Sequence, residues 1–315
     1  MKRNVSRLLG AIGVATLLAG ALGNTQLSAQ AAGGAQGGPG GIGAPNFADA
    51  KRACPMVRDF AAFYACASEK IKTFRTTKRT KEGKPDFNGI WSPTRIANNI
   101  EQDGGTKSLI VDPPNGKIPY LPWAQKPREE GHDKWLSPTA ACLPVGAVRW
   151  AYSPVSVTGQ RFIQQPNEII FSMERLHTYR IIPLDNSRRL ASRVKLWQGE
   201  SRGRWEGDTL VIDTTNLNDV VWFDHIGTFM SDEMKMEERF TYVDPDTLLY
   251  VATYTDPKVF SQKWKISKGF LRAPAKGLDR VDLEDTTVEG CEETVAHLIG
   301  AGQRTWTGLH LVLPK

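Results

Sequence analysis

Apolar and polar residues alternate along much of the second half of the chain, and this period of two predicts β-strands with one buried and one solvated face. The run Ser201–Asp213 reads as two strands around a Gly-containing turn, and Arg239–Tyr254 repeats that design. Consecutive antiparallel strands of this kind predict a meander that closes into a barrel, so the expected fold class is mainly β. Strands are expected at Val155–Thr158, Arg161–Gln165, Glu168–Met173, His177–Ile182, Val194–Gly199, Gly203–Trp205, Thr209–Thr215, Met234–Val243, Leu248–Thr255 and Val259–Lys265.

An apolar stripe ahead of these strands predicts one amphipathic helix within residues 47–75, docked on the barrel. Its members recur at spacings of three and four: Phe60, Phe63, Tyr64, Ala67 and Ile71. Pro55 predicts a break near the start of this helix. The barrel domain then covers residues 76–315, in which the proline-rich stretch 109–127 is expected to be an ordered loop. A short helix is expected near Glu292–Ile299.

The first 31 residues have the pattern of a secretory signal peptide. Basic residues precede the apolar run Leu8–Gly23, and Ala29-Gln30-Ala31 is a small-x-small cleavage pattern. A membrane anchor is the alternative, but the run is shorter than the ~20 apolar residues that a spanning helix needs. We therefore expect a periplasmic or secreted protein that is cleaved near Ala31. Residues 32–46 are rich in Gly, Ala, Pro and Gln and predict a disordered leader.

Four cysteines in a chain destined for an oxidising compartment predict two disulfides, for which three pairings exist. The favoured pairs are Cys54 with Cys66 and Cys142 with Cys291. On one unbroken helix Cys54 and Cys66 would lie ~18 Å apart, beyond disulfide reach, so the first pair requires the bend near Pro55.

Charge and local motifs exclude several classes of function. The formal net charge of +6 falls by three when the signal peptide is removed, and acidic and basic residues alternate, so a nucleic-acid partner is not expected. Gly38–Gly43 fits GxGxxG but lies in the leader, without the strand and helix that a dinucleotide site requires. Gly199–Gly203 fits GxSxG, but a strand follows where a nucleophile elbow needs a helix, so a serine hydrolase stays a minor alternative. The histidines are scattered along the sequence and there is no CxxC, so no metal and no cofactor are expected.

Phe87-Asn88-Gly89-Ile90-Trp91 places a Gly-x-Trp at the expected first strand, where it resembles the element that closes the base of lipocalin-type barrels. A strand-start Trp in another β core is the alternative. A wider set of motifs resembles a family of secreted bacterial proteins, and within it the γ-formaldehyde lyases of lignin-dimer breakdown. These motifs are Asp86–Trp91, Asp112–Tyr120, Cys142-Leu143-Pro144, Tyr179–Asp185, Ser201–Asp213 and Glu238-Arg239-Phe240.

The resemblance implies a cofactor-independent lyase that converts a phenylcoumaran into a stilbene and releases formaldehyde. Two departures from the family pattern point to a different substrate: Lys235 stands where a histidine is common, and Glu292-Glu293-Thr294 replaces an aromatic segment. A non-catalytic periplasmic carrier of a small aromatic or apolar molecule is the alternative, since the same barrel suffices. Stable membrane insertion is not expected, and a homodimer is compatible with the sequence.

The proposed chemistry needs a base at a hydroxyl group and a donor at a departing phenolate. The candidate catalytic residues are His225, Asp224, His177 and Arg202, for each of which a surface or core role is the alternative. The candidate substrate-binding residues are Trp91, Tyr179, Trp205, Trp222 and Tyr254.

Alternation also predicts which residues share a face of each strand. His177 and Tyr179 lie on one face and Arg180 on the other. Glu238 lies on an apolar face, opposite the solvent-facing Lys235, and would need a partner, because burial of a lone carboxylate is costly.

Overall fold

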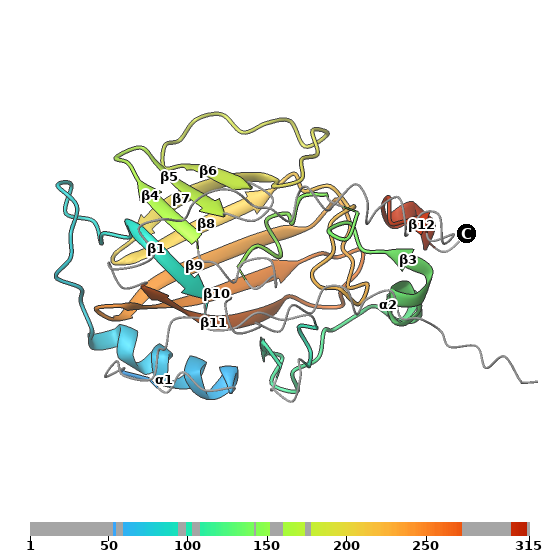
Figure 1. Ribbon diagram of the computed structural model, residues 1–315, viewed down its shortest axis with the longest axis horizontal. Helices are drawn as coiled ribbons and strands as arrows, with labels where there is room; N and C mark the ends of the chain where they lie inside the picture. The colour runs from blue at the N-terminus through green and yellow to red at the C-terminus, as the bar shows by residue number, and fades with distance from the viewer. Residues whose placement is uncertain are drawn as a thin grey trace, which may run out of the picture. The chain divides into compact units, whose positions relative to one another are not determined.

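The backbone forms one large antiparallel sheet that curls almost into a closed barrel, which confirms the mainly β fold class (Figure 1). The computed structural model describes residues 53–54, 59–93, 99–102, 108–141, 143–151, 160–173, 178–272 and 304–313. The expected signal peptide, leader, strand Val155–Thr158, helix Glu292–Ile299, residue His177 and pair Cys142–Cys291 lie outside the described residues.

The sheet has ten strands in the order β6-β5-β4-β1-β11-β10-β9-β8-β7, with β2 paired to β11 beside this path. A separate two-stranded parallel sheet joins β3 (Trp135–Leu136) to β12 (Arg304–Thr305), and Leu309–Leu311 form a 3-10 helix. The strands of the main sheet are β1 (Gly89–Pro93), β2 (Ile110–Asp112), β4 (Gln160–Gln164), β5 (Glu168–Met173), β6 (Tyr179–Pro183), β7 (Glu200–Glu206), β8 (Thr209–Thr215), β9 (Lys235–Asp244), β10 (Thr247–Thr255) and β11 (Trp264–Arg272).

The barrel has a seam between β6 and β7, the two ends of this path. All hydrogen-bonded neighbours on the path are antiparallel, so its nine strands alternate in direction and β6 and β7 run parallel to each other. No ladder joins these two strands in the described part of the chain. They approach closely because Gly203 has no side chain: a Cβ there would lie 2.6 Å from Leu184 Cδ2 and 3.0 Å from Ile182 Cγ2.

Helix α1 (Phe60–Thr73) packs on the outside of the barrel. It begins after Asp59, whose side chain accepts a hydrogen bond from Ala62 N at 3.0 Å and so caps the helix. Two of its buried residues, Phe63 and Ala67, pack with the outward-facing side of β9 and β10, namely Val243, Leu249 and Val251. The expected stripe is confirmed, but the helix is shorter than predicted: Cys54 precedes it and forms the expected disulfide with Cys66.

Three predictions for the elements are wrong. The chain at Pro122–Lys134 forms helix α2, because Pro122 occupies the first turn, where proline is tolerated. The expected strand Val194–Gly199 has only a single bridge from Leu196 to Leu217. The expected strand Val259–Lys265 is displaced to β11, because the Asp256 carbonyl accepts hydrogen bonds from Val259 and Phe260 and bends the chain into a turn.

Removal of the Cys54–Cys66 disulfide tests how much this link between α1 and the chain before it contributes to stability. We expect Cys54→Ser/Cys66→Ser to lower the free energy of unfolding by about 3 kcal/mol, the loop-closure value for a loop of this length. Urea titration of purified protein measures this. Ala65→Ser, an exposed change on the same helix, is the control and should alter the value by less than about 0.5 kcal/mol. Equal stabilities of the two variants would contradict the prediction.

Candidate functional site

An ion pair lies inside the barrel and spans the seam. Arg180 on β6 donates to Glu238 on β9, with Nη2 2.7 Å from Oε2 and Nη1 3.2 Å from Oε1. Both side chains are buried, with exposed fractions of 3% and 0%. Arg180 Nη2 also donates to Ser201 Oγ on β7 at 3.0 Å and to Thr214 Oγ1 on β8 at 3.2 Å. One guanidinium therefore links four strands from within.

Glu238 accepts two further hydrogen bonds, from Trp150 Nε1 at 2.7 Å and from Tyr250 OH at 3.0 Å. A buried carboxylate is tolerated when a counter-charge and several donors surround it, as they do here. The expectation that Glu238 needs a partner is confirmed. The alternation along β6 placed Arg180 and Tyr179 on opposite faces of the strand without showing which face turns inward. In the structure the Arg180 side chain points into the barrel, and Tyr179 is 62% exposed on the outer surface.

Residues 145–151, which we call the plug segment, reach into the barrel from the end where Tyr254 lies. Three interior side chains donate to its backbone carbonyls. Tyr254 OH donates to Val148 O at 3.2 Å, Gln160 Nε2 to Trp150 O at 2.9 Å, and Lys268 Nζ to Ala151 O at 2.9 Å. These donors come from β10, β4 and β11. The plug segment is thus held at several points around the barrel wall.

The Trp150 indole lies in a cage of aromatic rings. It stacks on Phe171, with ring centroids 4.8 Å apart and an interplanar angle of 23°, and on Phe270 at 5.9 Å and 24°. Further rings from the barrel strands surround it, namely Phe162, Phe240 and Tyr250. Around Trp150 the described interior of the barrel is filled by side chains, and each of them is almost completely buried.

Lys268 is fully buried beside this cage, with its Nζ 5.8 Å from the centre of the Phe270 ring. Burial lowers the pKa of Lys268 well below its ordinary value, because the low-dielectric interior disfavours the ammonium form. Burial therefore favours the neutral amine of Lys268. Lys268 was not among the candidate residues, because the last strand predicted from the sequence ended at Lys265.

Asp224 is fully buried at the plug end of the barrel. Its side chain stabilises the turn that follows it in the chain. Its carboxylate accepts from Thr228 Oγ1 at 2.9 Å and from the backbone N–H groups of Ile226 and Thr228, each at 3.2 Å. Burial raises the pKa of Asp224, against the lowering effects of Arg128, Thr228 and Arg149 of the plug segment. His225 is partly exposed. The Asp224 carboxylate is directed at the N–H and hydroxyl donors of its own turn.

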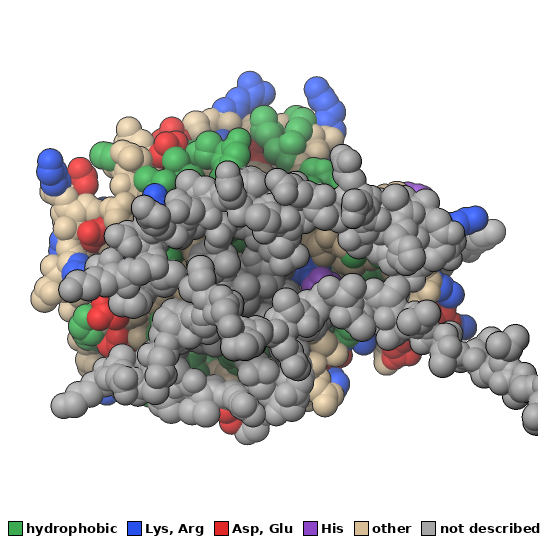
Figure 2. Space-filling view, in the orientation of Figure 1, with side chains coloured by type: hydrophobic (Ala, Val, Ile, Leu, Met, Phe, Trp, Pro, Cys, Tyr) green, Lys and Arg blue, Asp and Glu red, His purple; other side chains and the backbone are tan. Residues whose placement is uncertain are grey.

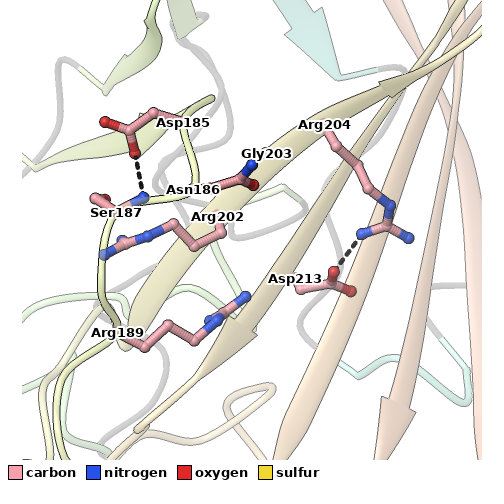
Figure 3. Close-up of a pocket in the computed structure, with 8 residues that line it drawn as sticks. All are labelled: Asp185, Asn186, Ser187, Arg189, Arg202, Gly203, Arg204 and Asp213. Atoms are coloured by element: carbon pink, nitrogen blue, oxygen red, sulfur yellow. Dashed lines mark hydrogen bonds and ion pairs between the residues drawn. The ribbon is translucent and has the colours of Figure 1, made fainter.

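Arg202 lies on the outer face of β7, in a surface pocket of about 310 Å³ (Figure 3). Its Nη2 is 2.8 Å from Glu200 Oε1, and Arg204 beside it is paired with Asp213. Even-numbered residues of β7 point outward, whereas Ser201 and Gly203 point inward. Arg202 is thus separated by the barrel wall from the aromatic cage.

The expected binding residues are divided between the two ends of the barrel. Trp91 is buried at the end opposite the plug, 5.9 Å from Tyr242, with the Arg272 guanidinium 4.3 Å from its ring centre. Trp205 lies at the same end and is half-buried. Tyr254 lies at the plug end, whereas Trp222 packs on Trp306. Tyr254 therefore contacts the plug segment, Trp91 meets the cage through Phe162 with ring centroids 6.1 Å apart, and Tyr179 lies on the outer surface.

Comparisons with models of protein families, with curated proteins and with solved structures found no match for this chain. The resemblance to secreted lyases consequently stays a prediction. None of the helices in the described ranges is long and apolar enough to cross a membrane. On the face in Figure 2, the visible lysine and arginine side chains of the described residues lie at separate places, mostly near the margin.

Loss of the interior ion pair should lower the free energy of unfolding far more than loss of a surface ion pair. We expect Arg180→Met to lower the free energy of unfolding by about 3–5 kcal/mol, because Glu238 is left buried without a counter-charge. Urea titration measures this. Arg204→Met on the outer face of β7 is the matched control, with an expected cost below about 1 kcal/mol. In Arg180→Met/Glu238→Leu most of the loss should be recovered; a double variant less stable than Arg180→Met would contradict this account.

Asp224 should give stability a dependence on pH with a definite sign. Because its pKa is raised in the folded protein, the stability from the protonated form is complete below the unfolded pKa, about 3.9, and is lost as pH rises through the folded pKa. Relative to Asp224→Asn, the wild type should lose stability in urea titrations as the pH rises above about 4. The pKa of exposed Asp185 is lowered by its hydrogen bonds with Ser187, so relative to Asp185→Asn the wild type should lose stability as the pH falls below about 4 and show no slope above it. Parallel curves for all three proteins would refute this assignment.

Proposed function

We propose that the barrel binds a small planar phenolic molecule among its interior aromatic rings, with the phenolic oxygen at the Arg180–Glu238 pair. The observation that carries this proposal is the combination of a ring cage with a buried carboxylate that accepts hydrogen bonds from an indole N–H and from Tyr250 OH. Ligand sites in proteins are mainly apolar and aromatic, with a few polar groups that fix orientation. Because side chains fill this level of the interior, one of them must move when a ligand binds.

The second candidate function is the lyase, and Lys268 favours it. In a phenylcoumaran, a base removes the proton of the hydroxymethyl O–H, and the C–C bond to that carbon breaks to release formaldehyde. The freed electron pair forms the C=C bond of the stilbene, while the ring C–O bond breaks and the phenolate oxygen takes up a proton. The conversion consumes no oxidant or reductant. Lys268, with its lowered pKa and its position beside the ring cage, fits the role of the base.

Binding and turnover are tested with one phenylcoumaran and its phenol-methylated analogue. We expect the free phenol to bind the wild type about tenfold more tightly in titration calorimetry, because only its O–H can donate to Glu238. Tyr250→Phe should weaken binding of the phenol. Tyr179→Phe, which removes the same atom on the outer surface, should not. Equal binding of both compounds would contradict the assigned position of the phenol.

Release of formaldehyde and stilbene fluorescence report the lyase reaction. If the reaction occurs, Lys268→Met should abolish turnover and retain binding of the substrate. Binding without product in the wild type would favour the carrier. Absence of both binding and product would remove both candidates.

A further inference from the structure

Trp150 differs from the other rings of the cage in its origin. Phe162, Phe171, Phe240, Tyr250 and Phe270 all project from strands β4, β5, β9, β10 and β11. Trp150 instead comes from the plug segment, which has turn conformation and no strand pairing. The wall of the cage and its occupant therefore belong to different parts of the fold, and the occupant can leave without breaking any backbone ladder of the barrel.

The contacts of the indole are those that a phenolic ring would make. Its two flat neighbours, Phe171 and Phe270, lie within 24° of parallel, and its one polar atom donates to the Glu238 carboxylate at 2.7 Å. A phenol has the same two properties, a planar π-system and a single strong donor at its edge. Glu238 would exchange an N–H donor for an O–H donor and keep its bonds to Arg180 and Tyr250.

The anchoring of the plug segment also suits displacement. Two of its carbonyl partners, Gln160 and Lys268, are polar side chains in the interior, so they would face the vacated space when Trp150 and Ala151 leave. Gly146, with φ of +75°, forms a turn at the start of the segment that other residues rarely adopt. The donors that hold the plug segment thus become the polar lining of the site.

We propose that the Trp150 indole occupies the ring position of the ligand, and that a phenolic ligand binds by displacing the plug segment and donating to Glu238. This inference rests on the proposed function, because it assigns the place of the ligand within the barrel. It also implies that the wild type binds its ligand more weakly than the empty cage would, since the ligand competes with a tethered ring.

The decisive variant is Trp150→Ala, which leaves an indole-sized space in the cage; apolar cavities of about 150 Å³ are known to bind benzene. Indole and benzofuran serve as probes, because they share shape and only indole has an N–H. We expect Trp150→Ala to bind indole at least about tenfold more tightly than benzofuran in titration calorimetry, through the hydrogen bond to Glu238.

Trp222→Ala is the matched control. Trp222 is equally buried, but its Nε1 has no hydrogen-bond partner in the described part of the chain. A space at that position offers no carboxylate, so indole and benzofuran should bind it with equal affinity or not at all. A folded Trp150→Ala protein without a preference for indole would overturn the proposal.

Trp150→Phe keeps the test decisive if the alanine variant does not fold. It retains a ring in the cage and loses the donor to Glu238, so the plug segment is held less firmly and the phenylcoumaran should bind more tightly than it does to the wild type. Equal affinity of Trp150→Phe and the wild type for the phenylcoumaran, or no binding of it by either protein, overturns the proposal. If Trp150→Ala prefers indole but the wild type binds no phenol, the proposed function fails and the ring position stands.

Discussion

Closure of the barrel by side chains is the constraint on which the rest of the structure depends. Nine antiparallel strands leave β6 and β7 parallel at the seam, where the described chain has no backbone ladder. Arg180 supplies the missing connection from inside by donating hydrogen bonds to Ser201, Thr214 and Glu238. A buried guanidinium requires a buried carboxylate, and this carboxylate places a strong acceptor in the middle of an otherwise aromatic interior.

That acceptor connects the architecture to the candidate site. Glu238 binds Arg180 with both oxygens, and one of them also accepts from Tyr250 and from Trp150 of the plug segment. The group that stabilises the seam is therefore also the group that orders the plug. If the plug is displaced, the seam keeps its ion pair while the ring cage gains an open acceptor, so ligand binding and barrel integrity need not compete.

Much of the fold could be predicted from local pattern, and the site could not. Strands β5 and β8 have the predicted bounds, α1 buries three residues of the expected stripe, and Cys54 pairs with Cys66. The β11 strand lies further along the chain than predicted because the turn at Asp256 takes up the start of the predicted strand, and the ladders with β10, β1 and β2 hold it. Among the expected site residues, Arg202 and Tyr179 lie outside the barrel.

The sequence by itself determined the period of each strand, the position of its turns and the requirement that Glu238 have a partner, because these depend on residues near one another in the chain. Tertiary structure alone decided which face of β6 turns inward, and that Trp150 enters the cage. Period-two alternation is the same for both faces of a strand, and the choice between them is made only when strands distant in sequence curl together and bury one side.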